Sequence, residues 1–245
     1  MKSALPAQPN QSLLDGLAIL SRISVSREPR GVTALAKELG LELTRVNRLV
    51  KTMAHAGFLY RTAGRTYAPG AGLHVLAAHS LFASGTMERS RNILGRLAVH
   101  GRIVAFGVLW GGSVFYLYHW APGLAVDQAF GRLALYPAHL SSLGVALLAD
   151  RTPREAAAFA AKIPKRERAA FAAALAGARE RGFAEIPSPG GGRSIACTVG
   201  APPYAALGLS GPITDGEMPD LIGALRAAKA EIEAAMNSPK TKDHP

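Results

Sequence analysis

Residues 43–55 carry the pattern that most restricts how this chain can fold. Apolar residues recur there at steps of three and four, so a helix would gather them on one side. These residues are Val46, Leu49, Val50 and Met53. The other side is polar and basic and holds no acidic residue: Thr44, Asn47, Arg48 and Lys51, with Arg45 at its flank. Because so short a helix gains most of its stability from packing, the pattern predicts a small helical domain with this basic face outward.

Two further helices are predicted ahead of this segment. Leu13 and Leu17 begin a stripe of apolar residues at helical spacing, which indicates an amphipathic helix near the start of the chain. A second helix is expected after Thr33 as its N-cap, and Gly40 is expected to end it in the left-handed conformation. Two helices joined by a tight glycine turn, the second with a basic outer face, are typical of a helix-turn-helix.

A pair of short strands is predicted directly after the basic helix. Residues 58–61 and 66–68 flank a glycine turn, and Arg61 and Arg65 lie near its tip. Residues 41–70 contain five basic residues and one acidic residue, so this part of the chain would attract phosphates. A basic face alone is more often an ordinary solvated surface. The added strand pair favours a winged helix-turn-helix that binds duplex DNA.

Length and charge agree with a DNA partner. The 245 residues suit two domains, and the net charge of +11 favours a polyanion. A single cysteine, Cys197, leaves no internal disulfide and fits a cytoplasmic location. We expect disordered tails at residues 1–10 and 238–245, and no signal peptide at the start. The uncharged stretch 103–126 alternates in short bursts broken by glycines, so it predicts buried strands and no membrane span.

The remainder of the chain has an α/β pattern. Strands are predicted at residues 103–110, 114–120, 194–199 and 204–209. Helices are predicted at residues 87–98, at 164–181, at 218–236 and from a cap at 139–142 to residue 149, with a further helix opening at Thr152-Pro153. These elements together predict helices packed against a mostly antiparallel sheet.

Several stretches resemble the IclR-type bacterial regulators, and the resemblance covers nearly the whole chain. Residues 12–20, 32–40 and 40–53 are similar to the family's first, second and recognition helices, and residues 57–59 and 67–70 to its wing. The resemblance implies an α+β protein in three parts: a winged helix-turn-helix at residues 11–70, a linker helix at 71–84, and a GAF-like effector-binding and oligomerisation domain at 85–237.

The resemblance also implies which side chains meet DNA. The family's polar contact positions fall on Thr44, Arg45, Asn47 and Arg48, whereas Leu43 replaces a residue that is usually polar. With the basic residues of the helix and wing included, the expected DNA-binding set is Thr44, Arg45, Asn47, Arg48, Lys51, Arg61 and Arg65.

In the C-terminal domain, residues 137–144 and 207–212 are similar to the edge of the family's effector pocket and to its closing strand. A helix start at Ser141–Leu143 offers free N–H groups to a carboxylate. The expected effector-binding residues are Ser141, Ser142, Leu143, Cys197, Gly208 and Ser210. The family's usual lysine after the pocket glycine is Val145 here, which predicts a more apolar pocket.

These features lead to one main function and two alternatives. The main reading is a transcription regulator, a repressor, that acts as a homodimer or a dimer of dimers and responds to a small organic or aromatic acid. The first alternative is a DNA-binding regulator whose C-terminal domain only oligomerises. The second is an enzyme, but Cys197 and His139 have no third partner that would orient a nucleophile and base, and the histidines lack metal-ligand spacing. We therefore expect no catalytic residues, no metal and no cofactor.

Overall fold

The computed structural model describes residues 9–125, 135–188 and 190–237. The tails predicted at residues 1–10 and 238–245 lie outside this part, except for Pro9 and Asn10. Contacts within the chain group it into two units that meet between Ser84 and Gly85, and each unit has its own hydrophobic core.

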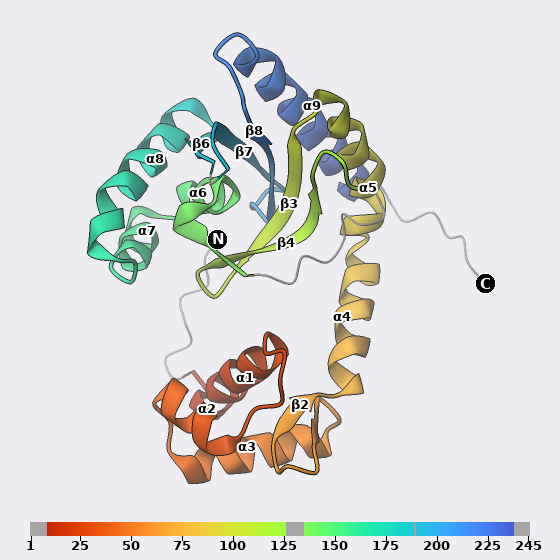
Figure 1. The fold of residues 1–245 in the computed structure, drawn as a ribbon, viewed down its shortest axis with the longest axis vertical. Helices are drawn as coiled ribbons and strands as arrows, with labels where there is room; N and C mark the ends of the chain where they lie inside the picture. Colours follow the sequence, from red (N-terminus) through yellow and green to blue (C-terminus); the bar gives the residue numbers. More distant parts are fainter. Residues whose placement is uncertain (1–8, 126–134, 189, 238–245) are drawn as a thin grey trace, which may run out of the picture. The chain divides into compact units, whose positions relative to one another are not determined.

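The N-terminal unit is a three-helix domain with a two-stranded wing, followed by a further helix. Ile19, Leu35, Val46 and Val50 are fully buried and bring the three helices together. The elements are α1 (Gln11–Ser24), α2 (Val32–Leu39), α3 (Leu43–His55), β1 (Leu59–Arg61), β2 (Tyr67–Pro69) and α4 (Ala71–Ser84) (Figure 1).

Local capping decides where these helices begin and end. The Asn10 side chain accepts a hydrogen bond from the Leu13 N–H at 3.1 Å and starts α1. Gly40 ends α2 with a φ of 63°, as predicted. The predicted cap at Thr33 is wrong, because α2 already begins at Val32. Arg30 forms a β-bridge with Tyr67, so the chain leaves an extended conformation there and enters the helix two residues early.

The C-terminal unit is an α/β domain built on one six-stranded antiparallel sheet, so the predicted α+β fold with a winged helix-turn-helix and a mixed C-terminal domain is confirmed. The strand order is β5-β4-β3-β8-β7-β6. The strands are β3 (Ile103–Trp110), β4 (Ser113–Trp120), β5 (Tyr136–Pro137), β6 (Ala184–Pro187), β7 (Arg193–Val199) and β8 (Ala205–Gly211).

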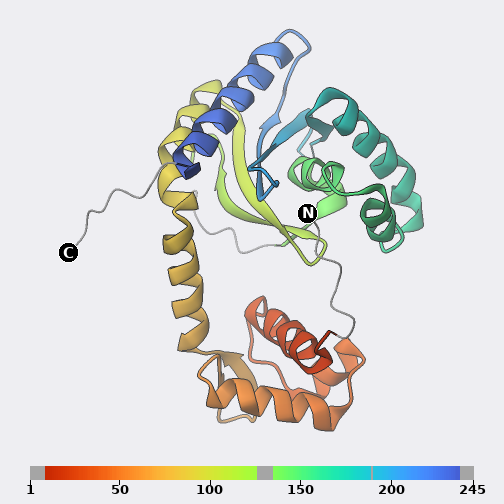
Figure 2. The same ribbon diagram turned by 180° about the vertical axis from the view of Figure 1, so that it is seen from behind.

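Helices cover both faces of this sheet (Figures 1 and 2). One core joins the sheet to α5 and α9, and a second core joins it to α6, α7 and α8. The helices and helical turns are α5 (Thr86–Arg96), η1 (Leu97–His100), η3 (Ala138–Leu140), α6 (Ser142–Ala149), α7 (Pro153–Ala160), η4 (Lys165–Glu167), α8 (Arg168–Arg181) and α9 (Met218–Asn237).

Helix α6 lies unusually close to the sheet. A Cβ atom placed on Gly208 would be 2.7 Å from the Ile195 carbonyl oxygen and 2.7 Å from Leu143 Cδ1. A side chain at this position of β8 would therefore collide with the backbone of the neighbouring strand β7 and displace the Leu143 side chain at the start of α6, so the position favours glycine. Among the described residues, no helix is both long enough and apolar enough to cross a membrane.

Candidate nucleic-acid interface and ligand cavity

Helix α3 has the two-sided character that its sequence predicts. Val46 and Val50 are fully buried, while Thr44, Asn47, Arg48 and Lys51 are exposed. None of these four exposed side chains takes part in the ion pairs found among the described residues. The outer face of α3 therefore offers hydrogen-bond donors and positive charge that the domain itself does not use, which is what contact with phosphates and base edges requires.

The wing adds two more exposed arginines next to α3. Strand β1 packs against α3 and pairs with β2 in the register Leu59–Pro69, Tyr60–Ala68 and Arg61–Tyr67. The turn between them is closed by a 2.7 Å hydrogen bond between the Thr62 and Thr66 hydroxyls. Arg65 lies in that turn with a φ of 59°, a conformation that costs a residue with a Cβ about 1–2 kcal/mol. Both Arg61 and Arg65 are exposed, so the wing extends the basic surface.

Arg45 differs from the other predicted contact residues. Its Nε lies 2.6 Å from Oδ2 of Asp15 on α1, and its side chain is only 31% exposed. Asp15 itself is buried. The structure therefore places Arg45 at the edge of the basic face, tied to the helix behind it.

A cavity of about 360 Å³ lies in the C-terminal domain at the start of α6. Strands β3, β4, β7 and β8 and the segment after β6 form its other walls. Cavities that bind small organic molecules start at about 300 Å³, so this one has room for a compound of a single ring. Five of the predicted effector-binding residues line it: Ser141, Ser142, Leu143, Gly208 and Ser210.

The cavity wall is rich in hydroxyl groups. Tyr116 Oη lies 3.2 Å from Ser141 Oγ, Ser142 Oγ lies 2.7 Å from Ser194 Oγ, and Ser210 donates to Ser188 at 3.0 Å. No Asp, Glu, Lys or Arg is found among its described lining residues, where His119 is the one imidazole. The described lining therefore offers hydroxyl groups and one imidazole as its polar side chains, without a carboxylate, ammonium or guanidinium group.

Neither Tyr116 nor His119 was among the expected effector-binding residues, and a regular strand would direct them to opposite faces of the sheet. Strand β4 contains a bulge: Phe106 pairs with Tyr118, but the next residue, Gly107, pairs with Tyr116. The extra residue, Leu117, reverses the alternation, so Tyr116 and His119 both line the cavity while Tyr118 is buried in the opposite core.

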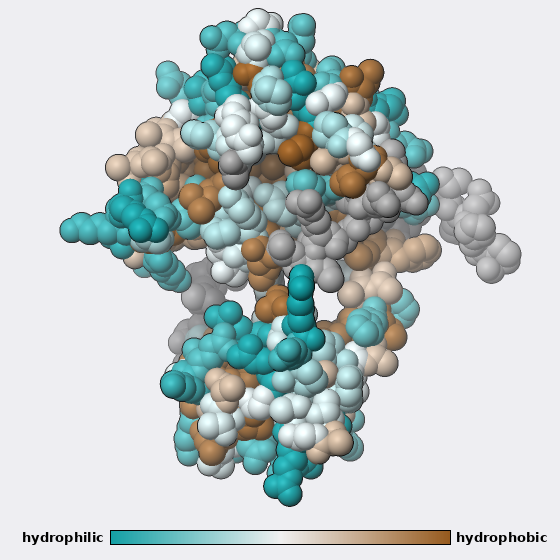
Figure 3. All heavy atoms as spheres, viewed as in Figure 1, coloured by the Kyte–Doolittle hydropathy of each residue, from teal (hydrophilic) through white to brown (hydrophobic). Residues whose placement is uncertain are grey.

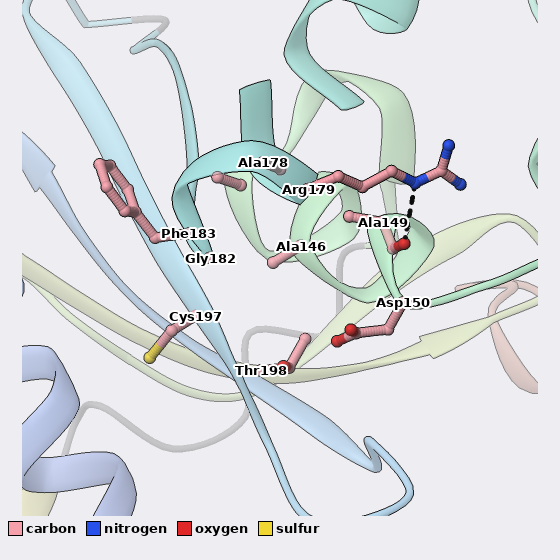
Figure 4. A pocket seen from close by; sticks show the side chains of 10 residues that line it. Ala146, Ala149, Asp150, Ala178, Arg179, Gly182, Phe183, Cys197 and Thr198 are labelled. Carbon is pink, nitrogen blue, oxygen red and sulfur yellow. Dashed lines mark hydrogen bonds between the residues drawn. The ribbon is translucent and has the colours of Figure 1, made fainter. Parts of the chain in front are cut away.

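Cys197 lies away from this cavity. Its thiol packs in the core beneath α9, 3.9 Å from the Leu225 carbonyl oxygen, and burial raises its pKa to about 11. It borders a smaller cavity of about 180 Å³, where Figure 4 shows its side chain directed away from Ala146 and Ala149. Its high pKa leaves the thiol protonated and a poor nucleophile. Within the described residues, no group of three or more His, Cys, Asp and Glu side chains could hold a metal ion.

The chain thus joins a winged helix-turn-helix, which is a DNA-binding motif, to an α/β domain that holds a cavity of ligand size. Residues 12–63 match the family model of the IclR helix-turn-helix domain. The N-terminal domain is therefore an IclR-type helix-turn-helix. No curated protein matches the chain in sequence.

Solved structures with the same fold extend the similarity to both domains. A protein of Silicibacter sp. TM1040 assigned to the IclR transcriptional regulators is 22% identical, with a TM-score of 0.78, over 96% of this chain and 99% of that chain. An IclR family regulator of Brucella abortus is 22% identical, with a TM-score of 0.76, over 97% of each chain. An IclR homologue of Microbacterium hydrocarbonoxydans in complex with 4-hydroxybenzoate is 21% identical, with a TM-score of 0.66, over 93% of this chain and 100% of that chain. The whole chain therefore has the fold of these transcriptional regulators.

Proposed function

We propose that this protein is a cytoplasmic repressor that binds a specific duplex sequence through α3 and the wing and releases it when a small organic acid enters the C-terminal cavity. The observation that carries the DNA-binding part is the exposed face of α3, where Thr44, Asn47, Arg48 and Lys51 stand without an acidic neighbour on the helix. Arg61 and Arg65 supply further positive charge for phosphates. The polar side chains of such a helix contact base edges, while nearby basic side chains bind the phosphates of the DNA backbone.

Selection of duplexes from a random library, followed by fluorescence anisotropy, tests this proposal. We expect one enriched sequence that binds at least about a thousandfold more tightly than a scrambled duplex, as specific binding proteins do. The Asn47→Ala variant should lose preference at one base pair, whereas Arg48→Ala should bind all sequences more weakly. Failure to enrich any duplex at low salt would refute DNA recognition.

The proposed effector is an aromatic acid with a single carboxylate. The Gly144 N–H of α6 donates to the Ser141 side chain, whereas the N–H groups of Ser142 and Leu143 can donate to a carboxylate at the positive end of the helix dipole. Without a lysine or arginine among the described lining residues, a second negative charge would be costly to bury. The complex of a similarly folded homologue with 4-hydroxybenzoate supports this ligand class.

Thermal unfolding with a panel of acids tests the effector. We expect 4-hydroxybenzoate to raise the Tm, and a dicarboxylate such as phthalate to leave it unchanged. A ligand at a hundred times its Kd adds about 2.7 kcal/mol to the free energy of unfolding, which is readily measured. If no acid changes the Tm while operator binding persists, the C-terminal domain serves oligomerisation alone.

We further propose that the protein binds DNA as a homodimer, alone or as a dimer of dimers, with α4 in the interface. This 14-residue helix contains no charged residue, and none of its residues is buried within the single chain. Val75, Leu76, Leu81 and Phe82 are all exposed, and the stretch of surface over α4 is largely tan and brown in Figure 3. Exposed apolar surface of this extent favours a second copy of the chain. A dimer also doubles the number of base pairs that are read.

A further inference from the structure

Asp15 is a buried carboxylate that plays no part in the functions described so far. It lies on the inner side of α1, near the fully buried Ile19, and its side chain is 7% exposed. A charge at such a place is costly unless it is paired, and an apolar residue would pack there at no such cost. We therefore expect the Asp15 carboxylate to hold a positively charged or hydrogen-bonding side chain in place.

Two side chains each contact one carboxylate oxygen of Asp15. Gln11 donates from Nε2 to Oδ1 at 2.7 Å, one turn earlier on α1. Arg45 Nε lies 2.6 Å from Oδ2. Neither of these two buried atoms takes part in a hydrogen bond among the described residues, so their contact is an ion pair. The Asp15 carboxylate thus links α1 to Arg45, the third residue of α3.

The contact holds the Nε atom of Arg45 and leaves 31% of its side chain exposed. Nε is fully buried, so the 31% of the side chain that is exposed belongs to other atoms. The two Nη groups lie beyond Nε along the side chain. Residues in the first turn of a recognition helix are the ones that contact base edges, and Arg45 is in that turn.

We propose that Asp15 is a positioning residue for DNA recognition: it holds Arg45 so that the Nη groups meet a guanine edge as a fixed fork. This inference rests on the proposed function, since it requires α3 to bind in the major groove. An arginine that is already held in one conformation loses little freedom when DNA binds. A fixed fork also discriminates guanine from other bases by its bidentate geometry, which a freely rotating lysine or arginine does less well.

The test compares variants on the duplex selected by the wild-type protein and on its scrambled control. Asp15→Asn keeps the shape of the side chain and removes the charge. We expect the ratio of the two affinities to fall roughly tenfold, the scale of one lost base contact. Arg45→Ala should lower the ratio at least as far, and the double variant should be no worse than Arg45→Ala. The matched control is Glu38→Gln, which breaks ion pairs with Arg22 and Arg30 in the same domain and should leave the ratio unchanged.

A merely structural role predicts a different result. In that case Asp15→Asn lowers the Tm, but the folded protein keeps its full preference for the selected duplex, and this outcome overturns the inference. Should Asp15→Asn fail to fold, Arg45→Lys decides the matter, because it keeps the charge but not the fork. We then expect a lower affinity ratio with unchanged affinity for the scrambled duplex, and an unchanged ratio would refute the role. A wild-type protein that selects no duplex would defeat the proposed function itself.

Discussion

The salt dependence of DNA binding gives the sharpest prediction for the basic face. Four basic side chains stand exposed on α3 and the wing of each chain: Arg48, Lys51, Arg61 and Arg65. A dimer would bring eight of them to the phosphates, and each contact contributes about −0.9 to the slope of log K against log salt. The expected slope is therefore about −7. Arg48→Ala removes two contacts from the dimer, which makes the slope about −5.

These slopes translate into large changes in affinity. Between 50 and 200 mM salt, the wild-type protein should lose affinity about twenty-thousandfold and the Arg48→Ala variant about two-thousandfold. Fluorescence anisotropy on one labelled duplex across this range measures both. Arg154→Ala, which removes an exposed arginine from α7, is the matched control and should keep the wild-type slope. Equal slopes for Arg48→Ala and the wild type would show that Arg48 does not meet a phosphate.

Three further predictions concern the interface, the cavity and the buried thiol. Leu76→Glu on α4 should convert the dimer to a monomer in light scattering and weaken operator binding. Val99→Glu, at an exposed site outside α4, should have neither effect. A Leu76→Glu variant that remains a dimer would exclude α4 from the interface. Gly208→Ala should lower the free energy of unfolding by about 1–3 kcal/mol and abolish the Tm shift with 4-hydroxybenzoate. Gly216→Ala, where an added Cβ meets open space, should do neither. A normal Tm shift in the Gly208→Ala variant would show that the ligand binds outside this cavity. Burial raises the pKa of Cys197 from 9 to about 11, so the free energy of unfolding should fall as the pH rises from 9 to 11. At pH 8, iodoacetamide should react far more slowly with Cys197 in the folded protein than in the protein unfolded in urea. Equal reaction rates would contradict the burial of the thiol.

The DNA-binding half was accessible from the sequence because its structure depends on local signals. The helical spacing of Val46 and Val50 specifies which face of α3 is buried, and Gly40 specifies where α2 ends. The error at Thr33 coincides with a contact distant in sequence, the bridge between Arg30 and Tyr67. The apolar stripe expected to begin at Leu13 and Leu17 is also wrong, because both are exposed and α1 buries Asp15, Gly16, Ile19 and Ile23 instead. Likewise, the sequence placed Arg45 on the flank of the basic face but gave no sign that Asp15 lies against it.

The C-terminal domain was harder to predict in detail, because its cavity is formed by segments far apart in the chain. Strand β6 was not predicted, since it is a four-residue edge strand containing Glu185 and Pro187 and owes its conformation to pairing with β7. Cavity residues Tyr116 and His119 depend on a bulge that no periodicity reveals. Cys197 was predicted to be near the ligand, but strand alternation turns its thiol to the opposite face of the sheet, beneath α9.

The close seating of α6 has a mechanical consequence. Its first turn packs on Gly208, where the Leu143 side chain occupies the space that a larger residue of β8 would need. Nearly all of its residues are buried, and it packs on α8 as well as on the strands. Because a protein interior is close-packed and barely compressible, we expect a displacement at Ser141 to shift α6 as a unit and to reach α8, against which it packs.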